Sequence, residues 1–275
     1  MIRPLSSLLL LTCLLASCTN SADPATTEPI RIDGSNGVRP LILSMVEAYQ
    51  RQYPDRSIAV GEGMSSADRI PALQADSIQI IMASHGLDVP RLEMDGYEVY
   101  RFAQMPVVLG VHQSVSLDSL DGATLCSIYA GRLQNWSELG GADLPIRPLA
   151  RPAAEVDMEV LMERVPCFGV IRFDSTVVTH ESSGDLARAL ASTGGGIGMT
   201  TLTRVEQSEG AIRALAFNGQ EPSVANMESG AYNLLRDAFL VVSPDAGPQV
   251  NHFLEFVAGA GAKVLREEGA LPLRR

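Results

Sequence analysis

Hydrophobic and polar positions switch repeatedly between a strand pattern and a helix pattern in the first third of the chain. Residues 30–33 (IRID) alternate apolar and charged side chains, which is typical of a strand, and residues 41–53 (LILSMVEAYQRQY) carry apolar side chains at helical spacing. The same order returns as a strand at 57–60, a helix through Leu73 and a buried strand at 78–82. Because strands that alternate with helices form parallel sheets covered on both faces, the pattern predicts an α/β fold with mainly parallel sheets.

The remainder of the chain continues with elements of both kinds. A continuous apolar run at 105–111 (MPVVLGV) predicts another buried strand. Beyond it, the pattern predicts helices at 119–133, 155–164, 185–191 and 250–267, and strands at 145–150, at the end of the glycine-rich turn 193–200, and at 239–243. This order suits two lobes, the first of which the chain leaves and later re-enters. We therefore expect lobe 1 at 30–112 and 219–275, and lobe 2 at 113–218.

The N-terminal segment has the composition of a secretory signal peptide. Arg3 precedes an apolar run at 8–16, which is much shorter than the roughly 20 residues that a membrane-spanning helix needs. Residues 15–18 read Leu-Ala-Ser-Cys and resemble a bacterial lipobox, in which the chain is cut before the cysteine and the thiol is lipidated. An ordinary signal peptide with a chance cysteine is the alternative. We predict a signal peptide at 1–17 and lipidation of Cys18.

Small, polar and proline-rich residues follow the predicted cleavage site. Residues 18–29 cannot bury enough apolar area to offset the entropy of ordering, so they predict a flexible tether. An exported chain with a lipidated N-terminus is expected in the periplasm or at the cell surface, held there by its acyl chains. Thr19 replaces the aspartate associated with inner-membrane retention in many Gram-negative cells. The pattern leaves both the inner and the outer membrane open.

The charge balance and the motifs argue against several classes of function. A net charge of −11 offers no basic face to nucleic acid. The chain lacks a Gly-x-Ser-x-Gly motif, and residues 193–200 lack the Gly-Lys-Ser/Thr of a nucleotide-phosphate loop. The histidines have no second ligand at metal-site spacing, although Glu181 follows one of them; they are His85, His112, His180 and His252. The sequence predicts neither a cofactor, a metal site nor an enzyme.

Two of the four cysteines remain as a candidate disulfide pair. Cys13 leaves with the signal peptide, and Cys18 is the proposed anchor. Cys126 and Cys167 remain in the exported part, where an oxidising compartment favours a disulfide between them. Two separate buried thiols that pack as small hydrophobic side chains are the alternative.

Small polar residues gather at three turns where a predicted strand meets a helix, at 34–37, 63–66 and 84–86. In an open parallel sheet such turns lie along one edge, where ligands bind. The unpaired amides at a helix N-terminus carry partial positive charge and suit an anion. Each turn by itself is also explained as a capped helix start. Their succession favours an anion site at this edge.

Residues 127–146 (SIYAGRLQNWSELGGADLPI) carry the most specific family likeness in the chain. They resemble the Ile-Tyr-x-Gly-x-Ile-x-x-Trp-x-x-x-Gly-Gly stretch of the phosphate-binding lipoproteins that serve ATP-driven importers. In family order, further similarities lie at Gly34-Ser35, 80–84 (IIMAS), 195–199, 229–234 (SGAYNL) and the terminal Gly-x-Leu-Pro-Leu. Together they span nearly all of residues 30–273. We expect Trp136 within the motif to pack against the protein and not to stack on a ligand.

The resemblance implies a fold and a set of ligand contacts. It implies a type II periplasmic-binding fold, in which two α/β lobes joined by hinge strands close over a dehydrated ligand. It also implies a monomer that captures phosphate or a related small anion and delivers it to an ABC permease. Carried over by position, the residues expected at the ligand are Gly34, Ser35, Asn36, Gly37, Ser65, Ser66, Ser84, His85 and Arg151. Short side chains let amides approach an oxyanion, and arginine binds it bidentately.

The chain departs from the family pattern at two places near the implied ligand. Residues 152–157 read Pro-Ala-Ala-Glu-Val-Asp where the family has its Gly-Ser-Gly-Thr loop after the arginine. Gly37 replaces the usual threonine of the first loop. Both changes predict a site that retains an arginine but has fewer hydroxyls. They leave three hypotheses: an importer's receptor for phosphate or another oxyanion, a repurposed binding lipoprotein that acts as sensor or scaffold, and an exported enzyme.

The enzyme hypothesis finds little support in the residues. Glu155 and Asp157 form the one carboxylate pair that could suggest acid–base catalysis. Side chains two residues apart at a helix start do not face one another, so solvated or capping roles explain them better. We predict a binding protein.

Overall fold

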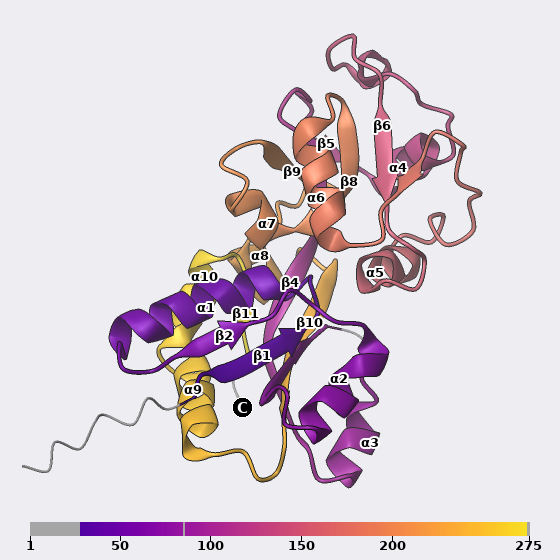
Figure 1. Cartoon of the computed structure of the whole chain (residues 1–275). Coiled ribbons are helices and arrows are strands. Elements are labelled where there is room, and N and C mark those ends of the chain that lie inside the picture. Colours follow the sequence, from indigo (N-terminus) through magenta and orange to yellow (C-terminus); the bar gives the residue numbers. More distant parts are fainter. Residues whose placement is uncertain (1–27, 85, 274–275) are drawn as a thin grey trace, which may run out of the picture.

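The computed structural model describes residues 28–84 and 86–273. The predicted signal peptide, the lipidation of Cys18, most of the tether and His85 lie outside the described residues. Figure 1 shows an elongated molecule with two halves, and long strands run between them. In the part of the chain that the structure describes, no helix has the length and apolar character that crossing a membrane requires.

The first predicted elements are confirmed with small changes in their bounds. They are β1 (Ile30–Gly34), α1 (Arg39–Gln52), β2 (Ile58–Val60), α2 (Ser66–Gln74) and β3 (Ile80–Ala83), and α3 (Val89–Met94) follows them. β1 pairs in parallel with both β2 and β3. Because parallel strands end on the same side, the turns after these three strands meet at one edge of the sheet.

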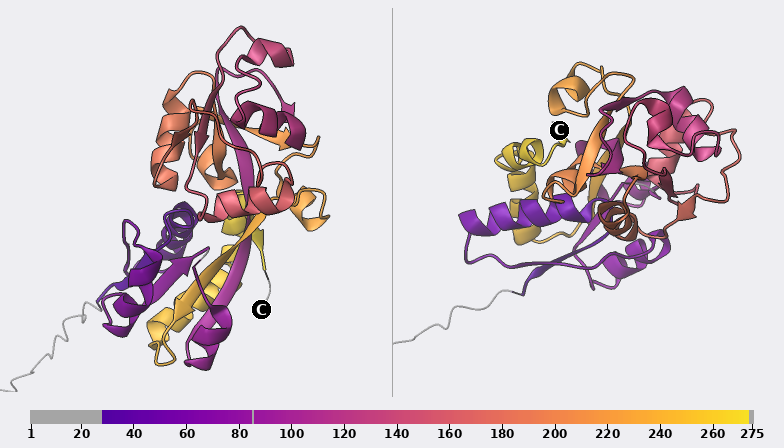
Figure 2. Two further views of the ribbon diagram at one scale, coloured as in Figure 1. Left: turned by 90° about the vertical axis from the view of Figure 1, so that its right-hand side faces the viewer. Right: turned by 90° about the horizontal axis from the view of Figure 1, so that it is seen from above.

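Two long strands connect the halves of the molecule. β4 (Glu98–His112) and β10 (Leu235–Val242) pair antiparallel with each other, and β10 also pairs antiparallel with β3. The later part of β4 pairs antiparallel with β8 (Gly196–Thr201) and β9 (Ile212–Phe217). Figure 2 shows β4 passing from one half into the other. The α/β class is confirmed, and these two strands make the combined sheet a mixed one, with the order β2-β1-β3-β10-β4-β8-β6-β7.

The second half contains shorter elements around β6 and β8. They are β5 (Ser119–Leu120), α4 (Gly122–Tyr129), the 3-10 helix η1 (Trp136–Leu139), β6 (Arg147–Ala150), α5 (Val156–Arg164), β7 (Val178–Thr179), α6 (Ser183–Ser192) and α7 (Leu202–Glu206). β6 pairs in parallel with β7 and β8. The last elements are α8 (Val224–Glu228), α9 (Pro248–Ala258), α10 (Gly261–Glu267) and β11 (Leu271–Pro272).

Two helices differ from their predicted bounds for local reasons. The predicted helix at 119–133 is wrong at its start, because Ser119 and Leu120 pair with β9 instead. The helix begins only after Asp121, whose carboxylate accepts the amide of Thr124 over 2.7 Å and caps α4. The predicted helix at 250–267 is in fact α9 and α10. Gly259 separates them with φ −110° and ψ −101°, which lie outside the helical range.

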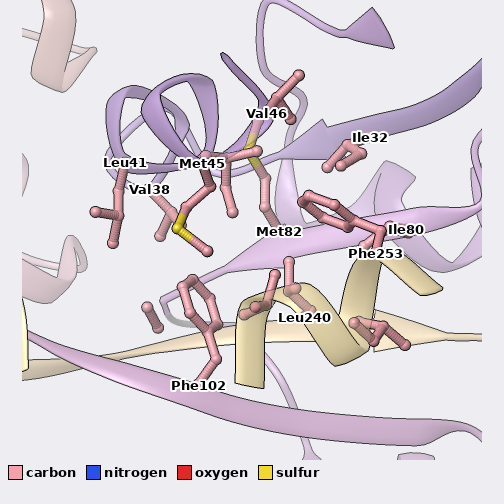
Figure 3. Packing of buried hydrophobic residues seen from close by; sticks show 14 of the residues in the cluster. Ile32, Val38, Leu41, Met45, Val46, Ile80, Met82, Phe102, Leu240 and Phe253 are labelled. Carbon is pink, nitrogen blue, oxygen red and sulfur yellow. The ribbon is translucent and has the colours of Figure 1, made fainter. Parts of the chain in front are cut away.

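Two large apolar cores lie on either side of the cleft that contains the candidate site. In the first, α1 packs on β1 and β3 through side chains such as Met45 and Met82, and Phe253 of α9 packs against them (Figure 3). The second core surrounds Tyr129, Trp136 and other buried residues. Along the chain, membership of the cores changes between 105 and 107 within β4, and again between 234 and 238 at the start of β10. The lobe boundaries proposed from the sequence, at 112 and 218, stay a prediction.

A disulfide joins Cys126 of α4 to Cys167 in the turn after α5, with a Cα–Cα distance of 6.2 Å. Cys126 is buried in the second core, and Cys167 packs against that core. The bond therefore fixes the C-terminal end of α5, whose N-terminal end lines the cavity described below.

Candidate functional site

A cavity of about 390 Å³ lies in the cleft between the two cores. One wall consists of the turns after β1 and β2, and the other consists of residues around the starts of α5 and α6. The lining residues are Ser35, Asn36, Gly37, Gly63, Met64, Ser65, Ser66, Arg69, Arg151, Glu155, Val156, Asp157, Glu181, Ser182, Ser183 and Arg236. The cavity thus lies at the sheet edge that the sequence pattern indicated.

The carboxylate of Asp33 holds the two turns of the first wall together. Its Oδ1 accepts the amide of Gly34 over 2.7 Å and the amide of Gly63 over 3.0 Å. Gly34 has a φ of 143°, and a Cβ at this position would lie 2.1 Å from the carbonyl oxygen of Met82. Only glycine lets the chain pass so close to β3 and turn into the cavity.

Four helices begin at the cavity. Residues 35–37 precede α1, while Ser66, Val156 and Ser183 are the first residues of α2, α5 and α6. The first-turn amides of a helix have no partner within the helix, and they carry the positive end of its dipole. Since four such ends lie around the cavity, the backbone contributes positive partial charge there, which favours an anion.

Arg151 contributes the first buried guanidinium of the site. It follows β6 and is 7% exposed, and its Nη2 lies 2.8 Å from Oε2 of Glu155. Its Nε is buried and has no hydrogen-bond partner among the described residues. The ion pair neutralises part of the charge of Arg151 but leaves this N–H donor available to a ligand.

Arg236 of β10 is a second buried guanidinium at the cavity. Its Nη1 donates to Oδ1 of Asp157 over 2.7 Å, and both side chains are almost fully buried. Its Nη2 donates to the carbonyl oxygen of Gly37 over 2.8 Å. Arg236 therefore links the turn after β1 to the start of α5, across the cleft.

Two further arginines raise the positive charge around the cleft. Arg69 of α2 lines the cavity and is 3% exposed. Burial lowers the pKa of Arg69, while the charges of Glu155 and Asp33 oppose this shift. Burial, followed by the charge of Arg236, lowers the pKa of Arg204 to about 10. Burial thus disfavours the charged form of both guanidiniums, and a bound anion would stabilise that form.

Most of the residues predicted at the ligand line the cavity. Ser35, Asn36, Gly37, Ser65, Ser66 and Arg151 are among the lining residues. Gly34 and Ser84 lie just outside the lining, and the hydroxyl of Ser84 is 3.3 Å from that of Ser35. His85 lies outside the described residues. The structure brings the predicted set together, and its contact with a ligand stays a prediction.

Sequence reasoning missed several residues that come to the cavity from distant parts of the chain. They are Arg69, Val156, Glu181, Ser182, Ser183 and Arg236, whereas Gly63 and Met64 belong to the predicted turn at 63–66. A signal for Arg236 exists in the sequence, because a charged residue inside the apolar strand 234–242 is rarely buried without a partner. Glu155 and Asp157, interpreted from the sequence as solvated or capping residues, are each paired with an arginine.

The described residues contain no group of three or more His, Cys, Asp or Glu side chains that could hold a metal ion. The cavity's polar side chains are hydroxyls, an amide, three guanidiniums and three carboxylates, of which Glu155 and Asp157 pair with guanidiniums. Such a set suits recognition of an anion by charge and hydrogen bonds.

Comparison with known families agrees with this geometry. A family model described as a PBP superfamily domain matches residues 19–260. The chain belongs to this superfamily. The match covers every segment that lines the cavity, so the candidate site lies wholly inside the PBP domain.

Relatives of this PBP domain include named binding proteins. The phosphate-binding protein PstS of Bacillus subtilis is 22% identical over 256 residues, which are 89% of this chain and 80% of PstS. The protein SphX of Synechococcus elongatus is 26% identical over 263 residues, 89% of this chain and 77% of SphX. The resemblance to the phosphate-binding family that the sequence motifs indicated is thereby confirmed.

A solved structure with a similar fold comes from Clostridium perfringens. It is a putative phosphate ABC transporter substrate-binding protein with bound phosphate, and it superposes with a TM-score of 0.72 at 23% identity. The similarity covers 90% of this chain and 100% of that chain. The predicted two-lobed periplasmic-binding-protein fold is confirmed.

Proposed function

We propose that this PBP-domain protein captures inorganic phosphate outside the cytoplasm and delivers it to an ABC permease. It acts as a monomer, by binding alone and without catalysis. The named relatives support the ligand class, since PstS is a phosphate-binding protein and the Clostridium perfringens protein holds phosphate. The two lobes enclose the anion in the cavity between them.

The observation that carries the proposal is the convergence of buried N–H donors on one cavity. Arg151 and Arg236 each keep a buried Nε without a partner among the described residues, and four helices begin around the same space. A buried donor that lacks an acceptor is costly, and a phosphate oxygen between the lobes would satisfy it. At about 390 Å³, the cavity has ample room for a tetrahedral oxyanion.

The test is a calorimetric titration of the purified chain with phosphate. We expect saturable binding, and Arg151→Ala should weaken it at least tenfold, because a hydrogen bond from a charged group is worth about 1.5–3 kcal/mol. Arg164→Ala is the matched control, since Arg164 lies at the exposed end of α5 and pairs with Glu163. Absence of binding at millimolar phosphate would overturn the proposal.

We further propose that lipid on Cys18 holds the protein at the membrane through the tether that follows. The support is the Leu-Ala-Ser-Cys sequence at 15–18 and the short apolar run before it. Fractionation of cells that express the whole chain tests this. Wild type should stay with the membranes and Cys18→Ser should not be anchored. Equal distribution of the two proteins would favour an ordinary signal peptide.

A further inference from the structure

Arg236 occupies a space that exists only because residue 37 is a glycine. A Cβ at Gly37 would lie 2.6 Å from Nη2 and 2.8 Å from Nη1 of Arg236, closer than real Cβ contacts come. Gly37 has no unusual φ that would itself require glycine. The absence of a side chain at Gly37 therefore serves the approach of the guanidinium.

Asp157 supplies the counter-charge that makes this burial possible. A guanidinium with 2% of its side chain exposed needs a partner, and the carboxylate of Asp157 receives Nη1 over 2.7 Å. Gly37 accepts Nη2 through its carbonyl oxygen. These two contacts fix the plane of the guanidinium from both sides of the cleft, and neither engages Nε.

A second buried guanidinium, that of Arg204, lies near Arg236. Burial, and after it the charge of Arg236, lowers the pKa of Arg204, whose own Nε is also buried without a partner among the described residues. Asp157 opposes this shift only in part. An anion at the cavity would stabilise both cations.

We propose that Arg236 is a second anion-binding residue of the cavity, held in place by Gly37 and Asp157, so that two guanidiniums grip the ligand from different elements. This inference rests on the phosphate-binding function proposed above. Arg151 follows β6 and Arg236 belongs to β10; both line the cavity, and each has a buried Nε without a partner among the described residues. Gly37 and Asp157, where the chain departs from the family pattern, thus both hold the guanidinium of Arg236 in place.

The test compares phosphate affinity in variants that leave no charge buried alone. Replacing Arg236 alone would leave the carboxylate of Asp157 buried without its counter-charge. The main variant is therefore the pair Arg236→Gln with Asp157→Asn. The matched control is Arg101→Gln with Asp237→Asn, a more exposed ion pair between β4 and β10 that does not line the cavity and has a 2.6 Å separation. We expect the buried pair variant to bind phosphate roughly 10- to 100-fold more weakly, and the control to bind as wild type does.

Two further variants keep the inference testable if the pair variant fails to fold. Arg236→Lys retains the charge but has no Nε–H donor, and it should weaken phosphate binding about tenfold. Gly37→Ala displaces the guanidinium and should also weaken binding. In the background of the Arg236 and Asp157 pair variant, Gly37→Ala should add no further loss, because its effect passes through Arg236.

The outcomes separate this inference from the proposed function. If wild type binds no phosphate, the proposed function fails and the inference falls with it. If wild type binds phosphate and Arg151→Ala weakens it, while Arg236→Lys and the folded pair variant bind within twofold of wild type, the function stands. In that case Arg236 is only a structural link, and the inference is overturned.

Discussion

Arg204 donates a hydrogen bond from Nη2 to the carbonyl oxygen of Asn36 over 2.9 Å. Arg204 belongs to α7, which follows β8 of the second core, whereas Asn36 lies in the turn between β1 and α1. The same Nη2 is 3.4 Å from the hydroxyl of Ser183 at the start of α6. One side chain thus holds the turn of one wall of the cavity to a helix start of the other.

From this link we predict that Arg204→Gln weakens phosphate binding by about three- to tenfold. The shorter side chain loses both contacts, so the turn at Asn36 is no longer held in position, and a charged hydrogen bond of roughly 1.5 kcal/mol is lost. Titration calorimetry measures the change. Arg213→Gln is the control, since Arg213 pairs with exposed Asp118 far from the cavity. Equal affinities for the two variants would contradict the prediction.

A second prediction concerns acid stability and Glu138 of η1. The backbone amides of Gln134 and Asn135 donate to its carboxylate over 2.9 and 2.8 Å, and they lower its pKa. A carboxyl with a lowered pKa stabilises the fold above its unfolded pKa of about 4.3, and this contribution disappears as the pH falls through the folded value. Glu138→Gln should therefore lower the urea midpoint at pH 7, and the difference from wild type should shrink as the pH falls below about 4.3.

The control for this comparison is Glu93→Gln, at an exposed position of α3. It should leave the midpoint at pH 7 unchanged. A loss in Glu138→Gln that persists undiminished at pH 3 would show that the charge of the carboxylate is not its cause.

Trp136 gives a third prediction. Its indole Nε1 donates to the carbonyl oxygen of Gly195 over 3.0 Å, and the side chain is 1% exposed. Trp136→Phe leaves that carbonyl without its donor and opens a small void, so it should destabilise the protein by about 1–3 kcal/mol in urea unfolding. Phosphate affinity should not change, because Trp136 does not line the cavity. A marked loss of affinity in a folded variant would instead argue for a role at the ligand.

The disulfide gives a fourth prediction. Cys126 and Cys167 are 41 residues apart in the sequence, and their bond restricts the unfolded chain. Replacing both with alanine should lower stability by about 2–4 kcal/mol, measured as the midpoint of urea unfolding. A reducing agent should lower the midpoint of wild type and leave the double variant unaffected. If the reducing agent leaves the midpoint of wild type unchanged, the bond does not form in solution.

Sequence reasoning reached the fold because the periodicity of its first elements is strong and local. The apolar positions of 41–53 and the buried run at 78–82 could be interpreted without knowledge of their neighbours, and both elements are present as α1 and β3. It failed at 119–133 and 250–267, where helical spacing continues across a break. A cap at Asp121 and the backbone of Gly259 decide the bounds there, and periodicity is insensitive to both.

Only part of the candidate site could be predicted from the sequence. Turns such as 34–37 follow their strands directly, so their position at the sheet edge could be predicted. Arg236 reaches the cavity because β10 returns between β3 and β4, and no local pattern encodes that return. For the same reason the ion pair of Asp157 could not be predicted, since its partner Arg236 lies 79 residues further along the chain.

The passage of β4 through both halves has a consequence for how the molecule unfolds. Its residues 102–105 are buried in one core and its residues 107–111 in the other, without a break in the strand. Unfolding of either core would remove the packing partners of one end of β4 and expose the apolar side chains of that end. Local opening on one side therefore raises the free energy of the other, and a single cooperative transition is expected. The amides of β4 should be among the last to exchange with deuterium.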